Sequence, residues 1–215
     1  MTSIIFATLG PSGTNHEFVA QKYIDFHELS EATLRLSDTA TTGVEAVRDG
    51  VADYFIICAV HPDTPNIVGR FFRVVFIVDT FISPSLPLAV LTRADVNTPR
   101  SIGVLHPATT EYIDTSKWER VCKITTGSLH TVADGLLQGQ YDSGLVYLNY
   151  AHRYPGQLRV DREIGSPDDA WLVLGRKRTF TNTILAWKDG PISTQFAEFA
   201  RAVPSHSAAT MRSSW

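Results

Sequence analysis

The sequence predicts an α/β fold of two lobes, each a mainly parallel sheet with flanking helices, with a ligand cleft between the lobes. The chain has 215 residues, which exceeds a typical single core and suits two joined lobes. Apolar runs typical of buried strands alternate with helical runs, as in α/β domains. In addition, one pattern of helix, turn and strand occurs twice along the chain, which indicates two lobes of similar construction.

The expected elements follow from these runs in chain order. Short runs rich in Val, Ile, Leu and Phe read as strands, and longer runs with helical spacing of apolar residues read as helices. The expected strands are 4–9, 34–37, 53–60, 71–81, 86–93, 102–105, 122–127, 143–148, 171–176 and 181–188. The expected helices are 16–26, 41–50, 109–118, 130–139 and 192–203.

The repeated pattern lies in two segments, 41–57 and 130–146. In each, a helix ends in glycine, and a short turn containing aspartate leads into a strand. A Ser or Thr precedes each helix where an N-cap would lie. The matched pairs are Thr39 with Ser128, Gly50 with Gly139 and Asp53 with Asp142. Two ordinary αβ units that match by coincidence are the alternative.

The repeat sets the expected boundaries. The first lobe comprises 1–80 and 172–203, and the second lobe, 81–171, is inserted between these parts. This is the layout of a hinged fold that binds its ligand between the lobes. The small, polar residues of 204–215 are expected to be disordered.

Composition and charge exclude several classes of protein. The net charge is −3 with scattered basic residues, which argues against binding nucleic acid. No apolar run approaches the roughly 18 residues that would span a bilayer, and the first residues lack a signal peptide's features. Cys58 and Cys122 are isolated and are expected to be buried apolar residues. A cytoplasmic protein is expected.

A glycine-rich turn, LGPSGTNHEF, joins the first strand to the first helix. Gly13 lets the backbone approach a ligand closely, and Thr14 with Glu17 fits a capping box. Free N–H groups at such a helix start favour a carboxylate or phosphate. An ordinary, well-capped turn is the equally weighted alternative.

Further candidates lie where other strands end or helices begin. Thr39 and Ser128 would direct two more helix starts at the cleft, with plain capping as the alternative. His106, in VLHPATT, follows a buried strand, and Thr109 lies beside it; a histidine there could transfer a proton. His61 occupies a similar loop. The seven histidines show no metal spacing, so no metal site is expected.

The segment SPDDAW, before the last buried strand, holds adjacent carboxylates at the expected second crossover. Asp169 could serve as a general acid if it is desolvated. A solvated turn is the alternative. Without further information, these residues suggest an acid-binding cleft and leave the reaction open.

Taken in order, these segments resemble the catalytic domain of prephenate dehydratases over 4–175. LGPSGT is similar to the family's Leu-Gly-Pro-x-Gly-Thr stretch, and HP in VLHPATT to its Ser-His-Pro motif, with Leu105 in place of the Ser. The resemblance implies a periplasmic-binding-protein-like (type 2) fold and no cofactor. Asp169, Ala170 and Trp171 stand where the family has Thr-Arg-Phe, and the family's usual regulatory (ACT) domain is not expected.

The loss of Thr-Arg-Phe is similar to the divergent branch that includes the bacilysin-pathway prephenate decarboxylase. The resemblance therefore implies a lyase that decarboxylates prephenate, or a related small cyclic acid, without aromatising its ring. Asp169 or His106 would donate the proton, and Gly13, Thr14, Thr39, His61, Thr109, Ser128 and Trp171 would bind the substrate. Two alternatives stay open: a non-catalytic carboxylate-binding protein, and a dehydratase or isomerase recruited to another acid. A homodimer is a further open expectation.

Overall fold

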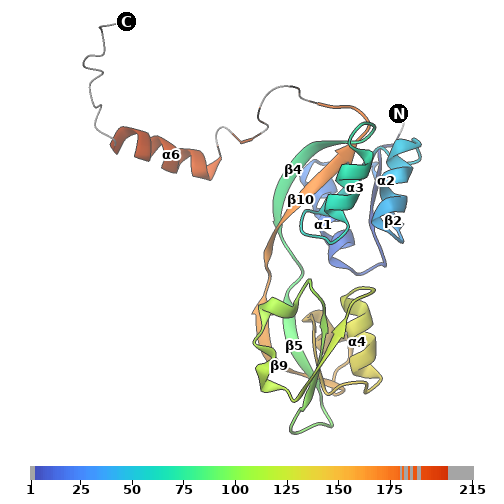
Figure 1. Ribbon diagram of the computed structural model, residues 1–215, viewed down its shortest axis with the longest axis vertical. Coiled ribbons are helices and arrows are strands. Elements are labelled where there is room, and N and C mark those ends of the chain that lie inside the picture. Colours follow the sequence, from blue (N-terminus) through green and yellow to red (C-terminus); the bar gives the residue numbers. More distant parts are fainter. Residues whose placement is uncertain (1–2, 180, 182–183, 185, 188–189, 203–215) are drawn as a thin grey trace, which may run out of the picture. The chain divides into compact units, whose positions relative to one another are not determined.

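The structure is a computed structural model that describes residues 3–179, 181, 184, 186–187 and 190–202. The described chain falls into two units, divided after Thr179. The first unit holds two five-stranded sheets, which appear one above the other in Figure 1. The described element of the second unit is one helix, α6 (Pro191–Ala202), close to the expected helix over 192–203.

The first sheet contains β1 (Ile5–Leu9), β2 (Thr33–Ser37), β3 (Tyr54–Cys58), β4 (Phe76–Pro84) and β10 (Asp168–Gly175). Its order is β2-β1-β3-β10-β4. The helices that accompany it are α1 (Asn15–Phe26), α2 (Ala40–Arg48) and α3 (Thr64–Phe71). Buried residues on both faces of the sheet form two apolar clusters, so helices cover it on both sides. We call this sheet and its helices lobe 1.

The second sheet contains β5 (Leu88–Arg93), β6 (Ser101–Leu105), β7 (Arg120–Ile124), β8 (Ser143–Tyr147) and β9 (Leu158–Gly165). Its order is β7-β6-β8-β5-β9. Two α-helices, α4 (Leu129–Leu137) and α5 (Asn149–Arg153), and two 3₁₀ helices, η1 (Thr110–Tyr112) and η2 (Thr115–Lys117), accompany it. We call this group lobe 2.

Both sheets are mixed in the same way. In lobe 1, β1 pairs in parallel with β2 and β3, whereas β10 runs antiparallel to both β3 and β4. In lobe 2, β6 pairs in parallel with β7 and β8, whereas β5 runs antiparallel to β8 and β9. Two short connections, 85–87 and 166–167, join the sheets. The strands that flank them are β4, β5, β9 and β10, and each of these pairs antiparallel with its neighbours.

The repeat predicted from the sequence is present in the structure. Helices α2 and α4 each have nine residues, and each begins with a capping box, at Thr39 and at Ser128. Gly50 and Gly139 follow these helices with φ of 77° and 74°, a left-handed conformation that glycine adopts without a steric penalty. The strands β3 and β8 come next, at the same distance along the chain from Gly50 and from Gly139.

The aspartates of the repeat also have one shared role. Asp53 accepts a hydrogen bond from the N–H of Ile5, at 2.9 Å, and Asp142 accepts from the N–H of Arg100, at 2.8 Å. Each carboxylate therefore ties the turn after a helix to the start of a neighbouring strand, β1 in lobe 1 and β6 in lobe 2. This shared contact explains why an aspartate follows the glycine at the same spacing in both segments.

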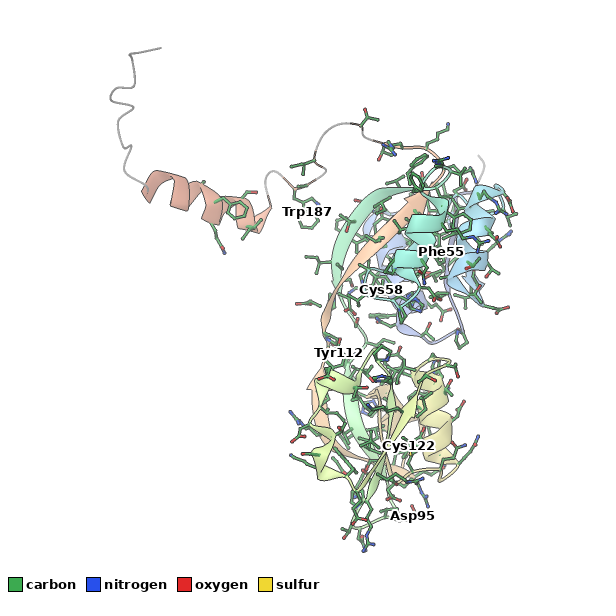
Figure 2. The ribbon with its side chains drawn as sticks, in the orientation of Figure 1. Phe55, Cys58, Asp95, Tyr112, Cys122 and Trp187 are labelled. Atoms are coloured by element: carbon green, nitrogen blue, oxygen red, sulfur yellow. The ribbon has the colours of Figure 1, made fainter. Side chains whose placement is uncertain are left out.

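Helix–sheet packing is matched in the two lobes but with the large and small residues exchanged. In lobe 1, Gly43 of α2 lies against Phe55 of β3, and a Cβ on Gly43 would lie 2.3 Å from that ring. At the matching positions of lobe 2, Val132 of α4 lies against Gly144 of β8. Phe55, labelled in Figure 2, is wholly buried. One small residue at each contact lets the helix approach its sheet.

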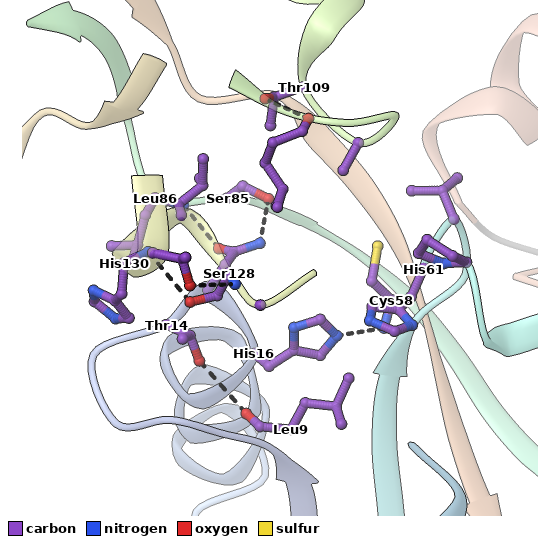
Figure 3. A pocket seen from close by; sticks show the side chains of 18 of the residues that line it. Leu9, Thr14, His16, Cys58, His61, Ser85, Leu86, Thr109, Ser128 and His130 are labelled. Atoms are coloured by element: carbon purple, nitrogen blue, oxygen red, sulfur yellow. Dashed lines mark hydrogen bonds between the residues drawn. The ribbon is translucent and has the colours of Figure 1, made fainter. Parts of the chain in front are cut away.

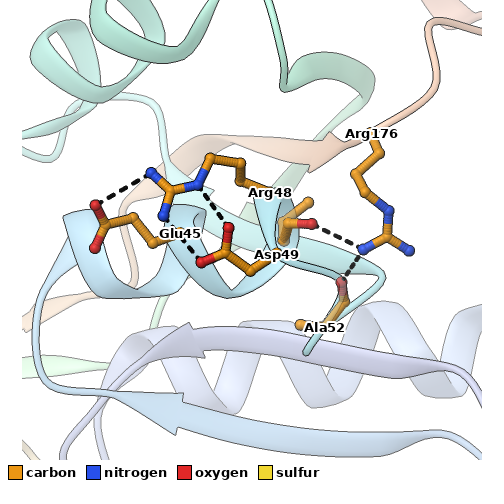
Figure 4. A network of polar contacts seen from close by, with 6 residues as sticks. Glu45, Arg48, Asp49, Ala52 and Arg176 are labelled. Atoms are coloured by element: carbon orange, nitrogen blue, oxygen red, sulfur yellow. Dashed lines mark hydrogen bonds and ion pairs between the residues drawn. The ribbon is translucent and has the colours of Figure 1, made fainter.

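Arg176 joins the end of β10 to the end of α2 (Figure 4). Its Nη1 donates to the carbonyl oxygens of Val47 and Ala52, each at 2.8 Å. These acceptors lie where α2 ends and in the turn that follows, and the guanidinium gives the Val47 carbonyl a second donor beside the N–H of Gly50. The neighbouring Arg48 forms a separate, exposed ion pair with Asp49.

Several expected elements differ from the structure. The helix expected over 109–118 consists of η1 and η2, each three residues long. Helix α3 was not expected: it begins at a Thr-Pro pair, where proline fits a first helical turn, and it buries Thr64, Ile67 and Phe71 along one face. The sequence reading also omitted α5 and β9. The described residues within 181–188 carry no strand, and the tail 204–215 lies outside the described residues.

Candidate functional site

A cavity of about 630 Å³ lies between the two lobes. Its wall comes from the loops after β1, β3 and β6, from the starts of α1, α2 and α4, and from the connections at Ser85 and Pro167. Figure 3 shows side chains from these elements converging on one space. Threonine, serine, histidine and aspartate side chains alternate there with Leu, Val and Pro. Such a mixed, concave wall suits a small polar molecule with an apolar part.

The loops after β1 and β6 have matching chemistry. Each has a cis proline, after Gly10 and after His106. Thr14 donates its hydroxyl to the carbonyl of Leu9, at 3.4 Å, and Thr109 donates to that of Leu105, at 3.0 Å. These two buried threonines therefore hold the loops against the ends of their strands.

The capping box expected at Thr14 does not form. The Thr14 side chain makes no capping hydrogen bond to the helix. Glu17 does reach back, and it accepts hydrogen bonds from Ser12 Oγ, at 2.8 Å, and from the N–H of Gly13. Gly13 has a φ of 83° and lies against the ring of His130. The turn is therefore held by Glu17, and the Thr14 hydroxyl serves its strand instead.

The starts of α2 and α4 both reach the cavity wall through Thr39, Ala40, Ser128 and Leu129. Thr39 Oγ1 accepts from the N–H of Thr42, and Ser128 Oγ from that of His130. Among the described residues, no protein group accepts from the N–H of Ala40 or Leu129. Two helix starts with free N–H groups thus meet one cavity, and such groups favour a negatively charged ligand group.

His16 lies deep in the wall of lobe 1. Its ring packs edge-on against Trp171, at a centroid distance of 5.1 Å, and against His61, at 5.5 Å. Burial, and secondarily His61, lowers the pKa of His16 to about 3, so the ring is neutral at physiological pH. The N–H of Cys58 donates to its Nε2 at 3.5 Å. This contact places the ring proton on Nδ1.

His61 and Cys58 complete this side of the cavity (Figure 3). His61 Nδ1 accepts from the N–H of Asp63, at 3.2 Å, and burial lowers the pKa of His61. Burial raises the pKa of the Cys58 thiol to about 11. A buried thiol is a poor nucleophile because the thiolate is the reactive form. The same group can still donate a weak hydrogen bond to a ligand.

Lobe 2 contributes His106, Tyr112 and His130. His106 Nδ1 hydrogen-bonds Thr110 Oγ1 at 3.1 Å, so the other ring nitrogen is available to a ligand. Tyr112 and Cys58, labelled in Figure 2, come from opposite lobes. His130 hydrogen-bonds Tyr150 through Nδ1, and burial lowers the pKa of His130. Among the described residues, its buried Nε2 has no hydrogen-bond partner.

Asp169 is the second residue of β10, close to the second connection between the sheets. Its Oδ2 accepts a hydrogen bond from Ser85 Oγ, on the first connection. Asn15, the first residue of α1, donates to the same Ser85 Oγ at 2.7 Å. Asn15 also donates its N–H to the hydroxyl of Tyr147, in lobe 2, at 3.1 Å. Both connections and both lobes therefore meet at this part of the cavity wall.

Seven of the residues singled out from the sequence line this cavity, and two do not. Those in the wall are Thr14, Thr39, His61, His106, Thr109, Ser128 and Asp169. Gly13 is outside the wall, beside His130, and Trp171 is fully buried behind His16. The sequence reading missed His16, Asn15, Ser85 and Tyr147. Asn15 and His16 directly follow Thr14, so the helix start was the available signal.

The charge of the wall is distinctive. Its described residues include four aspartates, Asp38, Asp63, Asp134 and Asp169, and no Lys or Arg.

Within the part of the chain that the structure describes, no group of His, Cys, Asp and Glu has a geometry that could hold a metal ion. The same residues include no helix long and apolar enough to cross a membrane. Cys58 and Cys122 are both free thiols, in different lobes.

No family model matches the sequence, and no curated protein matches it in sequence. Solved structures do match its fold. A prephenate dehydratase from Arthrobacter aurescens, in complex with L-Phe, is 19% identical with a TM-score of 0.58. That match covers 84% of this chain and 62% of the other, so this chain spans less than two thirds of that protein's length.

Two further structures extend the comparison. A prephenate dehydratase from Staphylococcus aureus is 15% identical with a TM-score of 0.51, covering 92% of this chain and 80% of the other. The periplasmic VFT2 domain of Bordetella pertussis BvgS is 13% identical with a TM-score of 0.51, covering 80% of each chain. At these identities the likeness concerns the fold. The chain has the two-lobe α/β fold shared by prephenate dehydratases and periplasmic-binding-protein-like domains.

Proposed function

We propose that this protein is a prephenate dehydratase-like lyase that acts on a small cyclic carboxylic acid in the cavity between its lobes. The observation that carries the proposal is the meeting of two free helix starts, at Thr39 and Ser128, with His106 and Asp169 in one cavity. The helix starts provide the site for a carboxylate. His106 and Asp169 provide groups that can transfer a proton.

The reaction that suits this arrangement is decarboxylation without aromatisation. The bond between the ring carbon and the carboxylate breaks, its electron pair moves into the ring alkene, and CO2 leaves. A proton from His106 or Asp169 then bonds to the far alkene carbon, and the ring hydroxyl stays in place. Prephenate is the first substrate to test, as in the divergent decarboxylase branch that the sequence resembles.

The absence of Arg and Lys from the described wall sets this cavity apart from the dehydratase pattern that the sequence resembles, in which the Thr-Arg-Phe segment supplies an arginine. An arginine pairs with a carboxylate through two parallel hydrogen bonds, and no neutral side chain replaces that pair. Asp169-Ala170-Trp171 occupies the segment where dehydratases carry their arginine. The proposal places the protein in the cytoplasm and requires neither cofactor nor metal.

The test is to incubate the purified chain with prephenate and to follow CO2 release together with the ultraviolet spectrum of the product. His106→Ala and Asp169→Asn are each expected to lower kcat/KM by about 100-fold if the altered residue is the proton donor. His152→Ala and Asp168→Asn are matched controls, because both residues are exposed and outside the cavity wall. Normal turnover by both cavity variants would refute these roles.

A non-catalytic acid-binding protein is the second candidate. It is favoured by the neutral state of His16 and Cys58, whose shifted pKa values leave them without charge at physiological pH. The fold it shares with the BvgS VFT2 domain also suits such a role. Saturable binding of prephenate or a related acid, without CO2 release or any change of the product spectrum, would establish this function instead.

A further inference from the structure

Helix α1 takes its first cap from the other lobe. The Thr14 side chain makes no capping hydrogen bond, whereas α2 and α4 each begin with a capping box of their own. The N–H of Asn15 donates instead to the hydroxyl of Tyr147, at 3.1 Å. Tyr147 is the last residue of β8, in lobe 2. An N–H group that the helix itself leaves free is thus satisfied across the lobes.

Tyr147 is well fixed for this contact. Its side chain is buried, and burial raises the pKa of its phenol to about 12, so the hydroxyl is neutral at physiological pH. Its ring packs edge-on against His130, at a centroid distance of 5.9 Å. His130 is the second residue of α4. Two neighbouring side chains of lobe 2 therefore lie at the start of α1.

His130, labelled in Figure 3, makes the second contact with lobe 1. A Cβ on Gly13 would lie 3.4 Å from both Cε1 and Nε2 of the ring, so the loop before α1 packs against this edge of the imidazole. Burial and then Arg153 lower the pKa of His130, whereas Asp134 and the backbone of Gly13 and Ser12 raise it to a lesser extent. The ring is therefore neutral at physiological pH and lies close to the backbone of that loop.

The polar groups that meet at this contact are complementary. His130 Nδ1 hydrogen-bonds the hydroxyl of Tyr150, and among the described residues its buried Nε2 has no partner. The N–H of Gly13 donates to Glu17, while no described group donates to the carbonyl of Ser12 or Gly13. A carbonyl oxygen only accepts, so pairing these groups requires the proton on Nε2 and makes Tyr150 the donor to Nδ1.

We propose that Tyr147 and His130 form an interlobe clasp on the start of α1, which holds lobe 2 against lobe 1 and must release when the cavity opens. In the closed arrangement, Tyr147 caps Asn15, and His130 donates from Nε2 to a carbonyl of the loop before α1. Leaving a buried donor unpaired is unfavourable, so this second hydrogen bond favours closure. Both side chains are positioning residues, because they act through that loop.

The clasp also reaches the chain about which the lobes would move. Asn15 Nδ2 donates to Ser85 Oγ at 2.7 Å, and Asn15 Oδ1 accepts from the N–H of Leu86 at 2.9 Å. Both partners lie on the first connection between the sheets, and hinge motions take place in such connections. The inference goes beyond the proposed function, since it concerns the opening of the cavity whichever acid binds there.

Amide hydrogen exchange of the full chain, without ligand, measures the first contact. Tyr147→Phe removes the hydroxyl and keeps the ring, so the amide of Asn15 should exchange about five- to tenfold faster. Tyr154→Phe is the matched control, because it removes a hydroxyl of lobe 2 outside the cavity wall. The amide of Phe6, on a strand that pairs on both sides, should stay protected in both variants, which separates the clasp from general unfolding.

Two substitutions at His130 test whether the contacts act together. His130→Ala does not alter the hydrogen bond between Asn15 and Tyr147, yet it should speed exchange of the Asn15 amide at least about threefold, because the two contacts close as one unit. His130→Gln places an amide N–H near the position of Nε2 and should restore most of the protection. A ring that serves only to fill space would not be replaced by glutamine.

The unaltered protein provides a test that needs no variant. Nitrogen-15 NMR of the His130 ring distinguishes a protonated from an unprotonated ring nitrogen, and it should find the proton on Nε2 and none on Nδ1. The clasp is refuted if Nδ1 carries the proton or if Tyr147→Phe exchanges Asn15 no faster than Tyr154→Phe. It is equally refuted if neither His130 variant alters that exchange, or if glutamine protects no better than alanine.

None of these measurements includes a substrate, so the clasp and the lyase proposal fail separately. Turnover of prephenate by a chain in which Tyr147→Phe leaves the Asn15 amide unchanged would keep the lyase and remove the clasp. The expected exchange rates together with no release of CO2 would do the reverse.

Discussion

The two lobes match closely in one half of their structure and differ in the other. The matching half comprises α2 with β3 and α4 with β8, where caps, glycines and aspartates recur. Even there, the helix–sheet contact is reversed: Gly43 faces Phe55 in lobe 1, and Val132 faces Gly144 in lobe 2. The packing of helix on sheet therefore depends on the combined volume of the two side chains in contact, and not on whether the helix or the strand carries the larger one.

The differing half follows β1 in lobe 1 and its equivalent, β6, in lobe 2. In lobe 1 the β1 loop leads into α1, which has 12 residues. In lobe 2 the equivalent loop leads only into η1, which has three. Counted from the two cis prolines, Pro11 and Pro107, His16 of α1 falls at the same position as Tyr112 of η1. The groups that distinguish the cavity, including His16 and Asn15, thus belong to the half that the lobes do not share.

The largest expected effect tests the reversed contact. Gly43→Ala should lower the free energy of unfolding by about 2 kcal/mol, because the new Cβ would lie 2.3 Å from the Phe55 ring. Gly144→Ala should change it by less than about 0.5 kcal/mol, since its nearest contact is 3.3 Å away. Urea unfolding of each variant provides the measurement.

A double variant sharpens this prediction. Phe55→Val in the Gly43→Ala protein should recover part of the loss, with a coupling energy of about 1 kcal/mol, because the two side chains compete for one space. Strict additivity of the two single changes would contradict the proposed exchange of volume between helix and strand.

The second prediction concerns pH and the pair His16 and Tyr112. The folded pKa of His16 is about 3 against an ordinary 6.5, so the unfolded chain binds the extra proton first as pH falls. Stability is therefore complete above pH 6.5 and declines below it. Between pH 7 and 5 the loss should be about 2 kcal/mol from His16 alone.

His16→Gln removes this contribution and should flatten the pH dependence of unfolding between pH 7 and 5. His61 and His130 have lowered pKa values too, so a smaller slope of the same sign should remain. Tyr112→Phe should leave the slope unchanged, because burial raises the pKa of that phenol and it stays neutral over this range. An unaltered slope in His16→Gln would show that His16 is not buried as described.

The third prediction compares helix caps. Thr39→Ala and Ser128→Ala should each lower the free energy of unfolding by about 1 kcal/mol, because each removes a capping box. Thr14→Ser keeps a hydroxyl where the side chain does not cap its helix, and should therefore cost less. Guanidinium unfolding at one fixed pH tests all three, and equal losses would show that the caps are not what distinguishes these positions.

The smallest expected effect concerns the arginines at corresponding strand ends. Arg176→Ala should lower the free energy of unfolding by about 1 kcal/mol through the loss of its two carbonyl contacts at the end of α2. Arg93, at the end of β5, pairs with the exposed Asp95, and Arg93→Ala should have no measurable effect. Thermal unfolding of both variants separates them, and a larger loss for Arg93→Ala would reverse this comparison.

The sequence predicted the features whose residues lie within one segment, and it did not predict contacts between residues far apart in the chain. The caps and glycines of α2 and α4 lie within one segment each, so their spacing predicted both units and the two-lobe fold. Helix α3 was missed because its last residue, Phe71, begins the apolar run 71–81, which was read as a strand. The hydrogen bonds that join Asn15, Ser85 and Asp169 link residues 70 and 84 positions apart. No local pattern predicts such a meeting, because only the tertiary fold creates it.

The two connections between the sheets meet at a single point. The N–H of Ser85 donates to the carbonyl of Pro167, at 2.9 Å, so the segment 85–167 begins and ends at neighbouring positions. A segment with adjacent ends can be inserted into, or removed from, a host without separating the strands on either side. Lobe 2 therefore has the geometry of an inserted module, whose two ends leave the sheet of lobe 1 intact.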